Sequence, residues 1–142
     1  MPDSAPLALL IPHAAPDQKT ARTVLIALRR IAAGGIDDAS AANLLLGSFG
    51  MGYRRPLMFL RVLMQEISRV SRQPISIAPC CCPRMTEGEA AILLAIERGT
   101  AHPEVSRAAL ASITGTLDLS PTLSVAQALG DALSDLGRPI SL

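Results

Sequence analysis

Three consecutive cysteines are the residues of this sequence best suited to chemistry. Cys80, Cys81 and Cys82 lie between two prolines in the run APCCCPRMT at 78–86. Thiolates bind soft metal ions, react with oxidants and act as nucleophiles. A helix that begins soon after the run, together with Arg84, would lower a thiol pKa and raise the reactivity of the thiol. The run therefore predicts a metal site or a redox-sensitive thiol, with a nucleophile as the weakest of the three readings.

The backbone of the run decides which thiols act together. Prolines at 79 and 83 favour an extended chain, which would point Cys80 and Cys82 to one side and Cys81 to the other. A soft-metal site would then join Cys80 and Cys82 to a third ligand from elsewhere. The candidates for this third ligand are Met85, His102 and His13.

Familiar cysteine spacings do not fit the run. Zinc knuckles place residues between their paired cysteines, whereas these cysteines are adjacent. Phosphatase-like loops have a longer spacing between cysteine and arginine than the one that separates Cys80 from Arg84, which argues against a nucleophile. The alternative to any site is that the three cysteines pack as small, buried, apolar side chains.

A glycine-rich turn followed by arginines is the second segment that suggests a ligand. The run GSFGMGYRRP at 47–56 leads into an expected helix, where free amides attract anions and glycines permit close approach. The anion site would use Gly50, Gly52, Arg54 and Arg55. Its spacing matches neither the dinucleotide fingerprint nor the P-loop, so a simple corner between two helices is the alternative. In that case the arginines would pair with acidic side chains of the chain itself, for which the candidates are Glu87, Glu89 and Asp131.

Six segments of helical periodicity position these two runs. In each, apolar residues recur at helical spacing between a capping residue or proline and a glycine or proline. The expected N-terminal caps are Asp17, Asp37 or Asp38, Thr86 in a capping box with Glu89, and Ser120. The expected helices cover 18–33, 39–46, 56–72, 87–98, 103–114 and 121–136.

The sequence therefore predicts an all-α fold, a single compact domain of five to six helices with one extended proline- and cysteine-rich segment. The first, third and sixth helices have the cleanest apolar stripes, and we expect them at the centre of the core. The segment 75–83 has room for one short strand, for which the sequence offers no partner. Residues 1–16 contain four prolines and are predicted to form an extended tail, which leaves 17–142 as the helical domain.

Composition limits the classes of function. The chain has 142 residues, of which 49% are hydrophobic and 18% charged, so a real core forms and apolar surface is left for a homo-oligomer. The net charge of +1 and the scarcity of aromatic residues argue against nucleic-acid binding. The N-terminus makes a poor signal peptide, and no apolar run is long enough to span a membrane. Arginine outnumbers lysine heavily, as in proteins of GC-rich bacteria, and we expect a cytoplasmic location with reduced thiols.

Five short motifs carry a resemblance to a known family. They are ALRR at 27–30, AAN at 41–43, GYRRP at 52–56, APCCCPRMT at 78–86 and DLGRP at 135–139. The chain resembles a small bacterial family known only as a domain of unknown function. The resemblance covers nearly the whole chain and implies a compact stand-alone protein, but it supplies no activity, cofactor or catalytic residue.

These observations favour a non-enzymatic function. No set of serine, histidine and acidic residues suggests catalysis, and the cofactor, if there is one, is not indicated. We expect a small cytosolic interaction or regulatory module that binds a partner protein or itself through apolar surface near residues 44–64. The alternative is a thiolate protein that binds a soft metal ion or senses oxidants through Cys80, Cys81 and Cys82.

Overall fold

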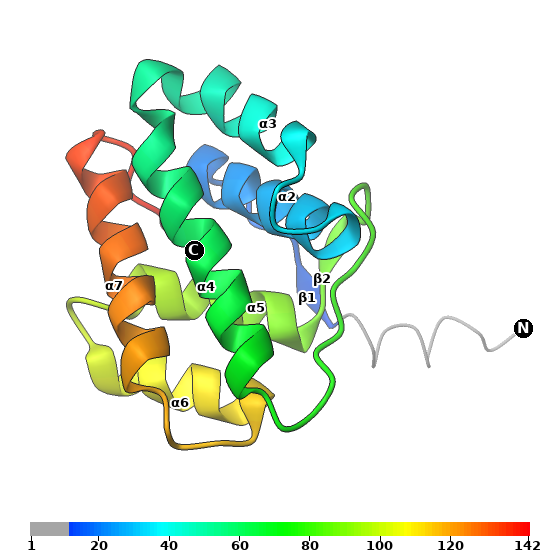
Figure 1. Cartoon of the computed structure of the whole chain (residues 1–142), viewed down its shortest axis with the longest axis vertical. Helices are drawn as coiled ribbons and strands as arrows, with labels where there is room; N and C mark the ends of the chain where they lie inside the picture. The colour runs from blue at the N-terminus through cyan, green and yellow to red at the C-terminus, as the bar shows by residue number, and fades with distance from the viewer. Residues whose placement is uncertain (1–11) are drawn as a thin grey trace, which may run out of the picture.

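A computed structural model describes residues 12–142 of the chain and confirms a mostly helical, compact fold (Figure 1). Most of the predicted N-terminal tail, residues 1–11, lies outside the described residues. Within the described residues the chain forms six α-helices, one short 3-10 helix and a two-stranded ladder. The helices are α2 (Lys19–Gly34), α3 (Ala39–Phe49), η1 (Gly50–Tyr53), α4 (Arg54–Val70), α5 (Glu87–Arg98), α6 (Pro103–Thr114) and α7 (Ser120–Asp135).

Capping residues explain where several helices begin. The predicted capping box at α5 is confirmed, because the Thr86 hydroxyl accepts a hydrogen bond from the Glu89 amide and the Glu89 carboxylate accepts one from the Thr86 amide. Asp38 caps α3, and hydrogen bonds from the Ser40 hydroxyl and the Ala41 amide lower the pKa of its carboxyl. The prediction for the first helix was wrong by one residue. Gln18 rather than Asp17 caps α2, because the longer side chain of Gln18 accepts the Ala21 amide.

The core joins the three helices that the sequence placed at the centre with one that it did not. In Figure 1, α4 and α7 run side by side, α2 and α3 lie at one end, α6 lies at the other, and α5 crosses behind α4 between them. α5 packs between α6 and α7, so its short apolar run is buried on both sides. The largest fully buried side chains of α2, α4, α5 and α7 are Leu25, Leu28, Leu60, Leu63, Ile92, Leu93, Ile96, Leu129 and Leu133.

A short ladder ties the described end of the tail to the cysteine segment. Strand β1 (His13–Ala14) pairs antiparallel with β2 (Arg84–Met85), with His13 opposite Met85 and Ala14 opposite Arg84. Residues 75–83 form no strand; the strand lies just after them, and its partner comes from the region that the sequence assigned to the tail. The consequence is that the cysteine run is held at its C-terminal side by a segment about 70 residues away in the chain.

Candidate functional site

The cysteine run forms a turn rather than the extended strand that the prolines suggested. The Cys82 amide donates a hydrogen bond to the Pro79 carbonyl at 3.1 Å, which closes a four-residue turn. This turn brings the sulfur atoms of Cys80 and Cys81 within 3.9 Å of each other. Cys81 is exposed, and Cys80 and Cys82 are partly buried. The predicted alternation, with Cys80 and Cys82 on one side, does not hold, and the neighbouring thiols are those of Cys80 and Cys81.

The guanidinium of Arg29, on α2, forms hydrogen bonds with backbone carbonyls of the cysteine turn. Its Nη1 donates to the Cys82 carbonyl at 2.8 Å and lies 3.5 Å from the Cys80 carbonyl. Its Nη2 donates to the Arg84 carbonyl at 2.7 Å. The Arg29 residue is only 3% exposed, so these bonds form inside the molecule. The carbonyl oxygens of the turn therefore face inward to Arg29.

Glu89, on α5, forms an ion pair with Arg29 and accepts hydrogen bonds from backbone amides on both sides of the cysteine run. Nε and Nη2 of Arg29 donate to the two carboxylate oxygens at 2.7 and 3.0 Å. The carboxylate also accepts the amides of Ala78 at 3.0 Å and Thr86 at 2.9 Å. Glu89 is fully buried. A buried ion pair needs such additional hydrogen bonds, because otherwise removing both charges from water costs more than their attraction returns.

Sequence reasoning missed the Arg29–Glu89 pair, although a signal for it exists. Arg29 lies four residues after Leu25, one helical turn away on the apolar stripe of α2, where a solvated arginine is not expected. Glu89 was identified only as the second member of the capping box. The sequence separation of 60 residues between the two gives no pairing rule. An arginine on a buried stripe is nevertheless a general reason to look for a buried carboxylate.

The three predicted third ligands do not gather around the cysteines. Met85 is buried in the core. The Nε2 atom of His13 lies 2.8 Å from a Glu87 carboxylate oxygen, and His102 precedes α6 with its Nδ1 3.7 Å from Glu104. Across residues 12–142, no group of three or more histidine, cysteine, aspartate or glutamate side chains has an arrangement that could hold a metal ion.

The glycines of the glycine–arginine turn have a role in backbone conformation and packing, and they do not form an open loop around a ligand. Gly50 has a φ of 65°, which favours glycine, and a Cβ at Gly52 would lie 2.5 Å from a Leu136 methyl carbon. η1 continues directly into α4, so the amides that open α4 belong to a helical run already begun. Gly52 is therefore needed where the chain passes closely over Leu136, at the C-terminal end of α7.

The two arginines of the predicted anion site differ in their surroundings. Arg55 lies 3.4 Å from the Asp135 carboxylate and 5.9 Å from the centre of the Phe59 ring. The internal partner of Arg55 is therefore Asp135, and none of the three acidic residues predicted for this role takes it. Glu89 binds Arg29, Glu87 binds His13, and Asp131 accepts a hydrogen bond from Thr100. Arg54, in contrast, has no ion pair or hydrogen bond with any described residue.

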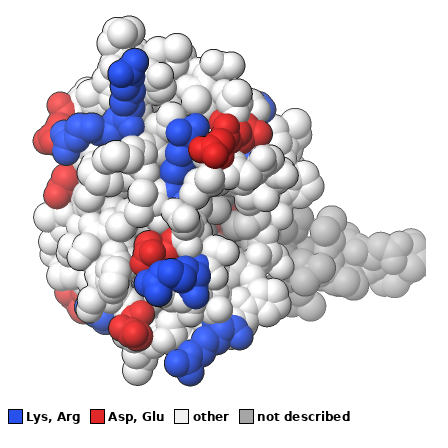
Figure 2. Space-filling model, in the orientation of Figure 1, with Lys and Arg blue, Asp and Glu red and all other residues white. Residues whose placement is uncertain are grey.

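Arg54 borders a shallow hollow of about 490 Å³ beside α4, which we call the α4 hollow. Two of its lining side chains are exposed and apolar, Met58 at 50% and Val62 at 36%. Its charged lining residues are Arg54, Arg61 and Asp37. Figure 2 shows basic and acidic side chains interspersed on the face that looks toward the viewer, with no single basic patch.

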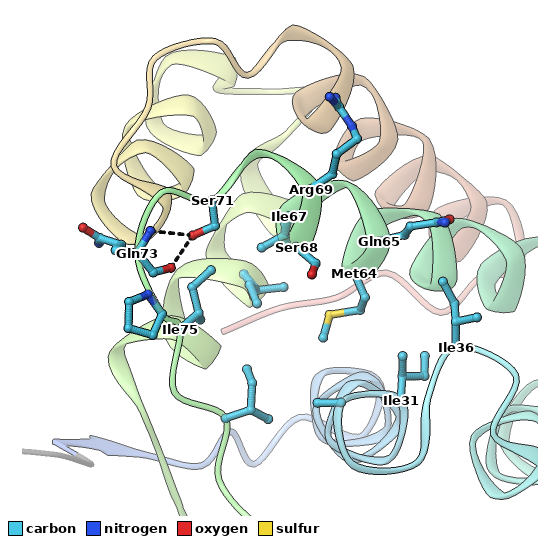
Figure 3. A pocket seen from close by; sticks show the side chains of 14 residues that line it. Ile31, Ile36, Met64, Gln65, Ile67, Ser68, Arg69, Ser71, Gln73 and Ile75 are labelled. Atoms are coloured by element: carbon cyan, nitrogen blue, oxygen red, sulfur yellow. Dashed lines mark hydrogen bonds between the residues drawn. The ribbon is translucent and has the colours of Figure 1, made fainter.

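A second, larger hollow of about 730 Å³ lies between α2, the C-terminal half of α4 and residues 71–77 (Figure 3). Ile31, Met64 and Ile75 point into it, and the polar side chain of Ser71 bonds to the backbone of Gln73. At its rim, the hydrogen-bonded Arg69 guanidinium lowers the pKa of the Glu66 carboxyl. The polar groups at this hollow that form hydrogen bonds, those of Arg69, Ser71 and Gln73, are engaged within the chain, and we assign no function to the hollow.

Comparison with known proteins gives one match. A family model described as "Family of unknown function (DUF6628)" matches residues 2–138. No curated protein and no solved structure matches the chain. Within the described residues, no helix is long and apolar enough to cross a membrane.

Proposed function

The chain belongs to this family of unknown function, so its activity has to be argued from its own surface, and we propose that it is a non-enzymatic interaction module that pairs with a second copy of itself through the α4 hollow. The observation that carries the proposal is the combination, at one place, of exposed apolar side chains with charges of both signs that have no partner among residues 12–142. Met58 and Val62 supply the apolar contact.

The charges around the hollow are suited to a symmetric partner. Among the described residues, Asp37, Arg54 and Arg61 make no ion pair or hydrogen bond, and Nε of Arg61 is buried without an acceptor. In a twofold dimer each copy presents the same surface, so Asp37 of each copy can pair with Arg61 of the other, which gives two equivalent ion pairs. A surface that carries both signs is therefore complementary to itself, as such a dimer requires.

Exposed apolar side chains gather in the same part of the chain. The exposed large apolar residues of α3, η1 and α4 are Leu46, Met51, Met58 and Val62. Methionine side chains adapt their shape to a partner, and contiguous apolar surface on a small protein often marks an interface. This segment falls within the range 44–64 that the sequence suggested for binding.

The first test is the oligomeric state of the full chain and its variants, measured by sedimentation or light scattering. We expect a dimer for the wild-type chain. Met58→Glu places a charge in the interface and should raise the dimer dissociation constant by about 30-fold or more, the effect of losing a hot spot of about 2 kcal/mol. Leu117→Glu is the matched control, because Leu117 is 80% exposed and lines a different hollow. A monomeric wild-type chain would refute self-association, and equal effects of the two variants would refute the α4 hollow as the interface.

A charge-reversal experiment tests the arrangement of the two copies. Asp37→Arg and Arg61→Asp should each weaken the homodimer, since each places like charges opposite one another. An equimolar mixture of the two single variants should restore dimers, because both cross-interface pairs are then opposite in sign. If the mixture stays as weak as its components, the pairing of Asp37 with Arg61 is wrong.

A further inference from the structure

We propose that Cys80 and Cys81 form a two-thiolate site for a soft metal ion. Their sulfur atoms lie 3.9 Å apart. Two thiolates bound to one tetrahedral ion at about 2.3 Å each would lie about 3.8 Å apart. The spacing that the turn imposes is therefore already close to the spacing that a bound ion requires. This site is independent of the α4 hollow and of self-association.

The turn is fixed before any ion arrives. Arg29 holds the carbonyl of Cys82 at 2.8 Å and that of Arg84 at 2.7 Å, and the pairing of Arg29 with buried Glu89 fixes the guanidinium itself. Prolines at 79 and 83 restrict the backbone further. Ordering ligands in advance lowers the entropy lost on binding. The buried ion pair thus gives the cysteine turn a fixed shape before a metal ion binds.

Because Cys80 and Cys81 are adjacent in the chain, their geometry favours binding a metal ion over forming a disulfide with each other. The Cα atoms of consecutive residues are about 3.8 Å apart at most, whereas disulfides join Cα atoms about 4.4–6.8 Å apart. A disulfide between Cys80 and Cys81 would distort the turn, so this pair is poorly placed to form an internal disulfide. Metal binding has no such requirement. Each thiol releases a proton to solvent, one sulfur–metal bond forms at each sulfur, and no electron is transferred.

The site is open on its outer side. Two protein ligands leave coordination positions for water or a small thiol, because His13 and His102 are held by glutamates and Met85 is buried. Structural zinc sites are closed by four protein ligands. An ion held by only two thiolates, one of them the exposed Cys81, exchanges readily, which suits ion sensing or transfer rather than the stabilisation of the fold.

The test is a titration of the full chain with Cd²⁺, after the chain has been reduced with a phosphine and stripped of metal with a chelator. Binding is monitored by the charge-transfer absorption of the cadmium–thiolate bonds. We expect one ion per chain. Cys80→Ala and Cys81→Ala should each weaken binding at least as much as the roughly 10–100-fold that loss of an outer-shell partner costs. Cys82→Ala is the matched control and should change affinity far less. Equal losses in all three variants, or Cd²⁺ binding that survives the Cys80→Ala/Cys81→Ala double substitution, would overturn the assignment.

Counting free thiols gives a second, independent readout. The wild-type chain has three free cysteines. After addition of one equivalent of Cd²⁺, a thiol reagent should react rapidly with one of them, Cys82, and slowly with the other two. Rapid reaction of all three thiols in the presence of the ion would show that no two-thiolate site exists.

Discussion

At the scale of single residues, the pair of Arg29 and Glu89 determines the geometry of the cysteine turn. A buried ion pair contributes little net stability, since desolvation offsets most of its attraction. Here the pair also satisfies backbone groups that no helix or strand would satisfy, namely the carbonyls of Cys82 and Arg84 and the amide of Ala78. We therefore regard it as a device that specifies one conformation of the turn.

Replacing Arg29 tests this role. Arg29→Met leaves Glu89 as an uncompensated buried charge and should lower the free energy of unfolding by about 3–5 kcal/mol, measured by urea denaturation. Arg30→Met is the matched control at the neighbouring position, since Nε of Arg30 has no hydrogen-bond partner among the described residues and the side chain is only partly buried. Its effect should stay within about 1 kcal/mol.

The double variant Arg29→Met/Glu89→Leu completes a thermodynamic cycle. Removing both charges should recover part of the stability lost in Arg29→Met, while the turn amides and carbonyls remain without partners. Additive losses in the double variant would contradict a direct interaction between the two side chains.

Some residue roles followed from the sequence and others did not. The capping box of Thr86 and Glu89 was predictable, because its two members are three residues apart and depend only on local backbone geometry. The contact of Arg29 with the cysteine turn depends on how α2 docks against α5, which local spacing does not encode. The same limit applies to Asp135, the partner of Arg55 from a distant helix.

At the scale of elements, two glycines allow α5 and α7 to approach closely, because glycine has no Cβ. An added Cβ at Gly130 would lie 2.8 Å from the Ile96 carbonyl oxygen, and one at Gly99 would lie 3.2 Å from the Gln127 Cα. Both contacts involve backbone atoms, which cannot rotate away. The two helices are thus in contact through their backbones, and the glycines are required by packing rather than by turns.

Two alanine substitutions in helices should therefore have opposite effects. Gly130→Ala should destabilise the protein, because α7 has to shift away from α5. Gly47→Ala meets no atom within 4 Å and lies inside α3, so it should stabilise the chain by about 0.5–1 kcal/mol through helix propensity. Thermal unfolding of the two variants beside the wild-type chain measures both effects. A rise in melting temperature for Gly130→Ala would show that the α5–α7 contact is looser than described.

Helix ends were more predictable than helix contacts. Pro103 begins α6 and Gly115 ends it with a φ of 74°, as the sequence indicated. In contrast, the glycine run at 47–52 was interpreted as a break, yet Gly47 lies inside α3 and η1 joins α3 to α4 almost without interruption. Glycine permits a turn but does not compel one, so the spacing of glycines alone could not locate the end of α3.

At the scale of the whole molecule, the sequence predicted the class of fold but not which distant segments contact one another. Helical periodicity and caps depend on neighbours along the chain, and they identified all six helices of the described region. The central position of α5 and the pairing of His13 with Met85 arise only when distant segments meet. Pairing of two-residue strands leaves no periodic pattern that a reading of the sequence could detect.

The buried carboxylate of Glu89 has a consequence for the rate of amide hydrogen exchange. Ala78 and Thr86 lie outside the helices, where backbone amides usually exchange with deuterium through small local openings. Their amides, however, donate to a carboxylate that is itself held between α2 and α5. Opening either bond would leave the buried Glu89 carboxylate without one of its hydrogen-bond donors, which is costly inside the molecule, so we expect both amides to exchange only through global unfolding, as slowly as the core of α5. In NMR-detected exchange, these loop amides should respond to urea with the slope of the whole protein, whereas the exposed Cys81 should exchange early.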